Sequence, residues 1–435
     1  MFNFEYDITS IINNKEYARK EGFRIFSFKS KNLKALEKNM KDIKSDDVDW
    51  KNKVTNLKRL IEKEKELNNR FIIRYSKDNI NSNNIHSYGL YRSLITDGNK
   101  IISFSPQKSQ SLDNFKNISK ENEIVYQEYV EGTMINMYYD GKWQIATRSN
   151  IGADIKFNFE TSLTFRDMFL EAFSNKGLEF DMFSKKYSYS FVLQHPENRI
   201  VVPFNKANIV LTNIYECKNK TVREIDINDE NEEWISKSNI NLINFPKNIA
   251  SILGEDNLTL EEIENKVHQG LDYTIQGIVL INKNKGIRSK IRNQNYENVR
   301  ILKGNSPKLQ YQYYNLRNFG KVKEFLNYYP EYKERFSKLR TQLHKWTDKL
   351  WSNYLKCYVN KEKPLIEFPF EFRNHIYNLH SIYLNELVMK KRYVGKSVVI
   401  NYVNDLPPDH LMSSINYPLK KVELDENKRN LINSC

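Results

Sequence analysis

Residues 129–148 read YVEGTMINMYYDGKWQIATR, and this stretch contains the clearest fold signal in the chain. Two runs rich in apolar and aromatic residues, Met134–Tyr139 and Trp143–Thr147, flank the dipeptide Asp140-Gly141. An Asp-Gly pair between two such runs is typical of a tight turn in a β-hairpin. The sequence therefore predicts an antiparallel hairpin here, preceded by a short segment that contains a glycine.

Short strands of the same kind recur from residue 71 to about residue 300. Asp97-Gly98 indicates a second hairpin turn, and Phe165–Ser174 and Leu260–Gln269 have the spacing of helical insertions. The other predicted strands are Phe71–Tyr75, Leu94–Ile95, Ile101–Phe104, Ser190–Gln194, Ile200–Pro203, Ile209–Tyr215 and Gly277–Asn282. This pattern predicts an α+β domain built on antiparallel sheet, which we assign to residues 71–304.

The two ends of the chain are predicted to be helical. Residues 1–70 form a charged N-terminal segment, and residues 305–435 form an all-α C-terminal domain. The residues that recur every three or four positions after Pro330 are Phe336, Leu339, Leu343, Trp346, Leu350 and Tyr354. Such a stripe is typical of a helix face that packs into a core. Further predicted helices are Asp46–Asn69, Phe372–Leu387 and Ser397–Val403.

The composition favours a polyanionic partner. The 435 residues include 68 Lys+Arg against 54 Asp+Glu, a net charge of +14, with 27 Tyr and 24 Phe interleaved. Basic residues among aromatic ones favour nucleic acid, and an ordinary solvated basic surface is the alternative. Cys217, Cys357 and Cys435 lie far apart, which indicates neither a disulfide framework nor a zinc ribbon. Without a signal peptide or a membrane-length apolar run, we expect a cytoplasmic protein with no membrane contact.

Several short motifs follow one another between residues 91 and 296. They are Tyr91–Ile95, Ser105–Lys108, Tyr129–Thr133, Pro196–Val201, Gln276–Val279 and Lys290–Arg292 with Tyr296 behind it. In this order they resemble the motifs of the RNA ligase 1 family, the phage tRNA-repair type of ATP-dependent RNA ligase in the covalent nucleotidyltransferase superfamily. The chain also resembles ligase-like proteins of large DNA viruses or yeast linear plasmids. The resemblance implies an antiparallel-sheet nucleotidyltransferase domain followed by an all-α C-terminal domain.

The positions that carry the chemistry of that family differ in this chain. Tyr129 stands where the family has its nucleophilic lysine, and Glu131-Gly132 replaces Asp-Gly. Val192 aligns with the glutamate that contacts the ribose, and Gln276 aligns with a glutamate that helps to hold a divalent metal. A phenol has a pKa near ~10 and is not an equivalent nucleophile. We therefore expect a degenerate site with no catalytic residue and no metal.

The cationic positions of the family persist. The candidate phosphate-binding or RNA-binding residues are Arg92, Lys108, Arg148, Asn198, Arg199, Lys290 and Arg292. A cleft that keeps its cations after losing acids has a more positive field, which favours a phosphate backbone. Structural interpretations stay open: Tyr129 as an aromatic of the sheet, Asn198-Arg199 as a corner, and Lys290 with Arg292 as a solvated strand edge.

The leading hypothesis is a pseudo-ligase that binds structured RNA such as tRNA without sealing it. The helical tail supports it by analogy, because the phage ligases carry a helical domain implicated in tRNA choice. An immunity or RNA-protection factor of a selfish element would fit an AT-rich coding genome. One alternative is an active RNA ligase that uses ATP and Mg²⁺ with a displaced nucleophile, either Lys142, Lys108 or Tyr129 itself. Another alternative is a protein-interaction scaffold. The RNA identity and the oligomeric state stay open.

Overall fold

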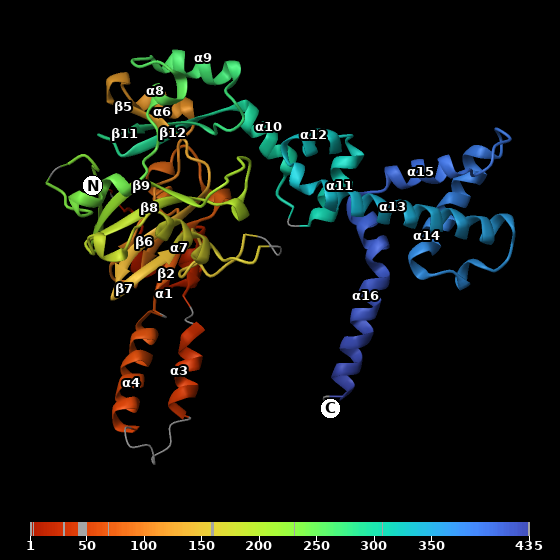
Figure 1. Ribbon diagram of the computed structural model, residues 1–435, viewed down its shortest axis with the longest axis horizontal. Coiled ribbons are helices and arrows are strands. Elements are labelled where there is room, and N and C mark those ends of the chain that lie inside the picture. Colours follow the sequence, from red (N-terminus) through yellow and green to blue (C-terminus); the bar gives the residue numbers. More distant parts are fainter. Residues whose placement is uncertain are drawn as a thin grey trace. The chain divides into compact units, whose positions relative to one another are not determined.

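The chain divides into two compact units, Met1–Glu297 and Asn298–Cys435, in the computed structural model (Figure 1). The structure describes residues 2, 4–28, 31–41, 50–67, 69–157, 161–229, 231–306 and 308–433. Positions 46–49 and 68 of one predicted helix, and Cys435, lie outside these residues. The described part is an α+β unit with antiparallel sheets followed by a helical region, as the sequence predicts.

A five-stranded antiparallel sheet forms the centre of the first unit. Its strands, in spatial order, are β10 (Thr221–Ile225), β9 (Asn208–Lys218), β8 (Tyr187–Gln194), β6 (Thr133–Asp140) and β7 (Lys142–Ala146). The predicted hairpin is confirmed, with Asp140 opposite Lys142 across the turn. The predicted helix α7 (Phe165–Asn175) covers one face, where Phe169, Phe173 and Phe191 share a buried core. Thr164 closes a capping box at the start of α7, which explains where this helix begins.

A four-stranded sheet packs on the opposite face of this central sheet. Its order is β1 (Phe23–Ser27), β2 (Phe71–Tyr75), β3 (Leu94–Thr96) and β4 (Ile101–Ser103). Ile72 and Ile95 share a buried cluster with Tyr138 of β6, and the Ser103 and Ser188 hydroxyls hydrogen-bond at 2.6 Å. The four N-terminal helices are α1 (Ile8–Asn13), α2 (Lys15–Lys20), α3 (Lys31–Lys41) and α4 (Trp50–Leu67). Strand β1 is a correction to the helical expectation for residues 1–70.

A three-stranded sheet, in the order β12 (Ile287–Arg292), β11 (Gly277–Asn282) and β5 (Ile124–Glu128), forms a separate lobe of this unit. Figure 1 shows its helices on the outer side: α6 (Leu112–Ile118), α8 (Ile249–Leu253) and α9 (Leu260–Gly270). Ile278, Leu280 and Ile291 point to these helices and form the buried core of the lobe. Because side chains alternate along a strand, the residues between them face the other way, toward the central sheet.

One predicted strand is wrong. Ile200–Pro203 forms no strand, because the amides of Val201 and Val202 hydrogen-bond to the Glu131 carboxylate instead of to a neighbouring strand. Strands β5 and β10 were not predicted, since charged and polar residues interrupt their apolar pattern. The helix α5 (Ile85–Tyr88) and the helix α10 (Gln294–Lys303) complete the helices up to the boundary between the units.

The second unit is helical. Its helices are α11 (Leu309–Asn318), α12 (Val322–Tyr328), α13 (Lys333–Tyr354), α14 (Phe370–Ile382), α15 (Lys396–Asp405) and α16 (Pro408–Asn433). Phe336, Leu343, Trp346, Leu350 and Tyr354 are buried along α13, which confirms the predicted stripe. Helix α14 continues as a π-turn to Leu387, where the predicted helix ends. None of the described helices combines the length and apolar character that a membrane crossing needs.

Candidate nucleic-acid interface

The inner face of the three-stranded sheet supplies one wall of a polar cavity. Gln127, Val279 and Lys290 lie opposite one another across β5, β11 and β12, so they form one row on this face. Gly277 begins β11 with φ of +140°, and a Cβ there would lie 2.2 Å from the Ile291 carbonyl oxygen. Glycine is therefore required where β11 comes closest to β12, the strand that carries the cations.

The central sheet supplies the other wall. Met134 of β6 lies opposite Val192 of β8 in the register. Gly132 precedes β6 with φ of +144°, and a Cβ there would lie 2.3 Å from the Leu193 carbonyl oxygen. This contact brings the Tyr129–Gly132 segment directly against β8. The segment that resembles a nucleophile motif is thus held between the two sheets.

The two walls enclose a cavity of about 140 Å³. Its lining residues are Arg92, Pro106, Gln127, Glu128, Tyr129, Val130, Gly132, Met134, Val192, Thr212, Gln276, Val279, Arg288 and Lys290. An adjoining cavity of about 650 Å³ shares Glu128, Tyr129 and Gln276 with it. The basic pocket, as we name the smaller cavity, thus brings together six sequence-predicted residues: Arg92, Tyr129, Gly132, Val192, Gln276 and Lys290.

Tyr129 and Lys290 interact directly at the centre of the basic pocket. The Lys290 Nζ donates a 2.6 Å hydrogen bond to the Tyr129 hydroxyl and lies 4.0 Å from the centre of its ring. Burial, and then repulsion by Arg92, Arg288, Arg292 and Lys108, lowers the pKa of Lys290 to about 6. The Lys290 amine is therefore largely neutral at pH 7, and an anion in the pocket would favour its protonated form.

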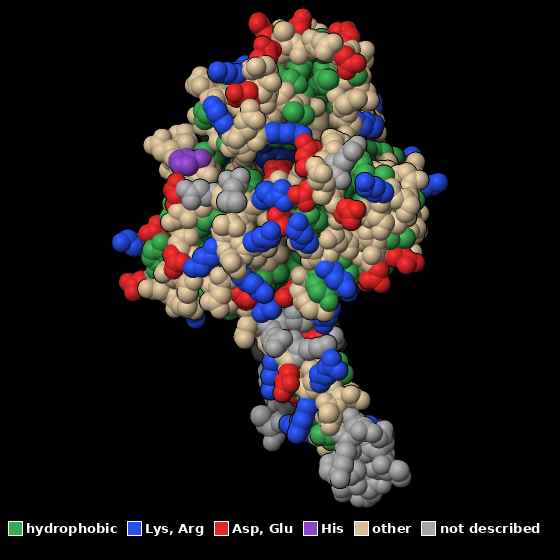
Figure 2. All heavy atoms as spheres, turned by 90° about the vertical axis from the view of Figure 1, so that its left-hand side faces the viewer, with side chains coloured by type: hydrophobic (Ala, Val, Ile, Leu, Met, Phe, Trp, Pro, Cys, Tyr) green, Lys and Arg blue, Asp and Glu red, His purple; other side chains and the backbone are tan. Residues whose placement is uncertain are grey.

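Other cations surround this pair. Arg288 and Arg292 flank Lys290 on the same face of β12, and Arg292 forms an ion pair with Glu297. Burial and repulsion by Arg92 lower the pKa of Arg288, whose Nε has no hydrogen-bond partner among the described residues. Figure 2 shows Lys and Arg side chains, with some acidic ones among them, gathered around a hollow below the uppermost lobe. An anion bound among them would relieve their mutual repulsion.

Lys108 and Arg148 lie beside the basic pocket rather than in its lining. The pKa of Lys108 is lowered by burial and by Arg92 and Arg292, which places it in the same cationic group. Arg148 donates from Nε to the Arg92 carbonyl oxygen at 3.4 Å, and its guanidinium carbon lies 5.5 Å from the centre of the Tyr75 ring. Both candidates thus belong to the rim of the site.

Asn198 and Arg199 make hydrogen bonds within the protein. Asn198 is buried and donates from Nδ2 to the Thr133 hydroxyl at 2.8 Å. Arg199 donates from Nε to the Val201 carbonyl oxygen at 3.0 Å. Neither residue lines the basic pocket. These contacts favour the interpretation of Asn198-Arg199 as a corner that supports the Tyr129–Gly132 segment.

Glu131 is a buried anchor. Its carboxylate accepts hydrogen bonds from the backbone amides of Val201 and Val202 at 2.8 and 3.0 Å. The residue as a whole is 4% exposed. Charge-assisted bonds of this kind are strong in a buried setting. The carboxylate therefore joins two segments of chain, and Glu131 also lines the adjoining cavity of about 650 Å³.

The sequence analysis missed Arg288, Gln127 and Glu128, all of which line the basic pocket. Arg288 could have been found, because Arg288, Lys290 and Arg292 alternate with the uncharged Ile287, Ser289 and Ile291 in the strand pattern. Gln127 and Glu128 lie on β5, a strand that was not predicted. Among the described residues, no group of three or more His, Cys, Asp or Glu is placed to hold a metal ion.

Lys142, a displaced nucleophile in one of the alternatives, does not line the basic pocket. It begins β7 at the far end of the hairpin, and its Nζ pairs with the Glu64 carboxylate at 2.6 Å. Lys108 donates from Nζ to the Ser109 carbonyl oxygen at 3.2 Å and lies outside the lining. Lys290 is the amine that touches the Tyr129 side chain.

Comparisons with known proteins give one informative match. A segment of 95 residues, 20% of this chain, is 33% identical to an RNA ligase of Rhodothermus phage RM378, and it spans 22% of that protein's length. No protein-family model matches the chain. A putative ATP-dependent DNA ligase from Aquifex aeolicus is 12% identical over 76% of this chain and 80% of its own, at a TM-score of 0.35. The segment match supports a ligase-like, nucleotidyltransferase-like protein.

Proposed function

We propose that this chain is a ligase-like protein that binds structured RNA, such as tRNA, without joining RNA ends. The observation that carries the proposal is the Tyr129–Lys290 contact inside a cavity whose charged lining is mostly cationic. The position expected to hold a nucleophilic lysine holds Tyr129. The neighbouring amine, that of Lys290, is hydrogen-bonded to the Tyr129 hydroxyl. The basic groups around them are suited to bind phosphates.

The residues around Tyr129 do not fit a Mg²⁺–ATP complex of the ligase type. Val192 has no atom that can hydrogen-bond a ribose, and Gln276 offers a metal an oxygen without a charge. Loss of a nucleophile typically costs on the order of a million-fold in rate, and the other members of a site do not compensate for it. Binding therefore survives these substitutions better than ligation does.

A tRNA titration at several salt concentrations tests the proposal. We expect binding that weakens steeply with salt, because each phosphate contact releases counterions. Lys290→Met should weaken binding and lower the salt slope by roughly one unit. Lys237→Ala, which removes an exposed lysine of the 3-10 helix Lys237–Leu242, is the charge-matched control. Micromolar or weaker binding with a flat salt response would instead favour the protein-interaction scaffold.

The lowered pKa of Lys290 favours a second candidate, nucleotidyl transfer with a displaced nucleophile. The Nζ lone pair would attack the α-phosphorus of a nucleoside triphosphate, the bond to the bridging oxygen would break, and pyrophosphate and one amine proton would leave. Incubation with α-labelled ATP and Mg²⁺, followed by a denaturing gel, separates the two candidates. A stoichiometric adduct that disappears in Lys290→Met would establish transfer and overturn the pseudo-ligase proposal.

An RNA-protection role follows from the same proposal. A protein that covers a tRNA surface should slow its cleavage by a ribonuclease that cuts tRNA. The measurement is the cleavage rate of a saturated tRNA with and without the protein, with Lys290→Met as the weakened binder. Equal rates at saturation would contradict an immunity or protection role and leave RNA binding itself untouched.

A further inference from the structure

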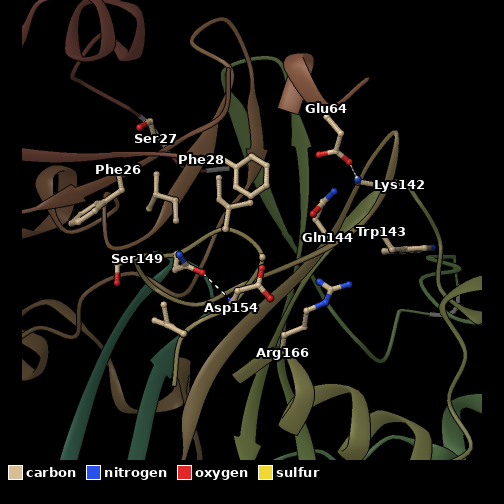
Figure 3. Close-up of a pocket in the computed structure, with 15 residues that line it drawn as sticks. Phe26, Ser27, Phe28, Glu64, Lys142, Trp143, Gln144, Ser149, Asp154 and Arg166 are labelled. Carbon is tan, nitrogen blue, oxygen red and sulfur yellow. Dashed lines mark hydrogen bonds and ion pairs between the residues drawn. The ribbon is translucent and has the colours of Figure 1, made fainter. Parts of the chain in front are cut away.

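A larger cavity, of about 700 Å³, lies at the other end of the β6–β7 hairpin (Figure 3). Figure 3 shows Phe26, Phe28, Glu64, Gln144, Asp154 and Arg166 around a common space. We name it the aromatic pocket. Its volume is in the range of sites that bind small molecules or single nucleotides, and none of the family motifs in the sequence contributes a residue to it.

Gln144 gives this cavity an unsatisfied hydrogen-bond donor. Its side chain projects from β7 beside the buried Tyr138, which lies opposite it in the register, and the residue is only 5% exposed. The Nε2 has no hydrogen-bond partner within the described part of the chain. Buried donors without a partner are rare in folded proteins. The amide therefore has no acceptor inside the described protein, and a group that enters the cavity could supply one.

The lining has the chemistry of a nucleotide site. Phe26 and Phe28 offer ring faces, and Phe28 packs against the buried cluster that contains Ile72 and Ile151. The Gln144 amide can pair with a donor–acceptor edge, as primary amides do with bases. Arg166 places a guanidinium on the same cavity (Figure 3), where an anionic group would bind. A nucleotide has a ring face, a polar edge and a phosphate.

Two arginines connect the aromatic pocket to the basic pocket. Arg148 reaches the Arg92 carbonyl oxygen on one side, and residues 149–152 that follow it line the aromatic pocket on the other. The Arg74 guanidinium carbon lies 5.4 Å from the centre of the Phe26 ring. Among the described residues, Arg74 Nε and Arg148 Nη2 lack hydrogen-bond partners, and burial lowers the pKa of both groups. Arg148 and Arg74 thus place cationic groups between Arg92 of the basic pocket and Phe26 of the aromatic pocket.

We infer that the aromatic pocket binds one unpaired base of the RNA strand whose phosphates the basic pocket holds. Arg148 and Arg74 contact the phosphates between them, Phe28 or Phe26 stacks on the base, and Gln144 hydrogen-bonds its edge. The inference rests on the proposed RNA binding and adds a site for a base to it. Met134, which lines the basic pocket, and Tyr138, which lies opposite Gln144 of the aromatic pocket, are four residues apart on β6, about 13 Å at strand rise.

The test compares two single-stranded oligoribonucleotides of equal length and charge, one with bases and one abasic, by fluorescence anisotropy with the full chain. We expect the base-containing strand to bind about tenfold more tightly, because stacking contributes to its affinity. Gln144→Leu should remove most of this difference without changing the salt slope, and Gln144→Met, which keeps the side-chain length without adding charge, should do the same. Equal affinity of the wild type for both strands would overturn the inference.

Controls separate this inference from the proposed function. Lys290→Met should lower the affinity for both oligonucleotides by the same factor. Lys237→Ala should leave both affinities unchanged. Saturation-transfer NMR with AMP and CMP, and with ribose 5-phosphate as the baseless probe, tests the pocket without RNA. Saturation-transfer signals from AMP or CMP that appear with the wild type and disappear with Gln144→Leu would support the base site, even if tRNA does not bind. Salt-dependent tRNA binding with no nucleotide signal and no base preference overturns the base site and leaves RNA binding standing.

Discussion

The Tyr129–Gly132 segment and strand β12 lie on opposite sides of the basic pocket, and they differ in how their polar groups are satisfied. In the first, the Glu131 carboxylate is occupied by backbone amides and the Tyr129 hydroxyl accepts from Lys290. In the second, Arg288 keeps an unpartnered Nε among the described residues, and the cations repel one another. Groups on the reactive side are used within the protein. On β12, Lys290 and Arg292 also have partners, in Tyr129 and Glu297, and the Arg288 Nε has none among the described residues.

This difference suggests how a site can lose chemistry and keep binding. Chemistry needs a free nucleophile and free carboxylates, whereas phosphate binding needs uncompensated positive charge.

Glu131→Ala should destabilise the first unit strongly. The change removes the acceptor of two buried backbone amides, so we expect a loss of about 3 kcal/mol in the free energy of unfolding. Denaturant unfolding measures this, with the exposed Glu255→Ala as the control. A loss near that of Glu255→Ala would mean that the Glu131 carboxylate is not an anchor, and the contrast between the two sides would fail.

Lys290 should couple RNA binding to proton uptake. Its pKa of about 6 in the free protein should rise when a phosphate binds, so the complex takes up a proton near neutral pH. Affinity should therefore increase as pH falls toward 6, by at most roughly tenfold per unit, and level off below that value. Lys290→Met should abolish this component of the pH dependence. Identical pH profiles for the two proteins would contradict a neutral Lys290 in the free state.

Arg148→Ala tests the rim of the site. Because Arg148 lies beside the basic pocket and outside its lining, we expect RNA binding to weaken a few-fold and the salt slope to fall by about one unit. The measurement is the same salt titration, with Lys237→Ala as the charge-matched control. A salt slope equal to that of the control would exclude Arg148 from the phosphate contacts.

Tyr129→Lys should produce no ligation. The change restores an amine at the position of the resemblance, but Val192 and Gln276 still offer neither a ribose contact nor a charged metal ligand, and the new amine would face Lys290. A gel assay with a nicked or broken RNA and ATP should show no joined product. Detectable sealing by this single variant would show that the reactive side is intact apart from its nucleophile.

The sequence predicted turns and helices, which depend on neighbouring residues, better than contacts between distant segments. The Asp140-Gly141 hairpin, helix α7 and the stripe of α13 follow from turn residues and apolar spacing, which act over a few residues. The strand expected at Ile200–Pro203 does not form, because the amides of Val201 and Val202 donate to the carboxylate of Glu131, about seventy residues away in the sequence. No local rule shows such a contact.

The candidate site was predicted through resemblance, and its gaps have a physical cause. Arg92, Tyr129, Val192, Gln276 and Lys290 meet in one cavity, although they come from separate motifs. Gln127 and Glu128 could not be anticipated, because they join the site through β5, whose residues are mostly polar or half-buried. The Tyr129–Lys290 bond links positions that are 161 residues apart and is visible only in three dimensions.

The way in which Glu131 holds Val201 and Val202 also limits the evolutionary future of this chain. Replacing Glu131 by the aspartate of the RNA ligase 1 family would shorten the side chain by one methylene. The amides of Val201 and Val202 would then lose the carboxylate that accepts their hydrogen bonds. The reversal would lower fold stability before any activity could be selected. A history in which catalysis is lost would then be difficult to retrace, since the first step back is itself deleterious.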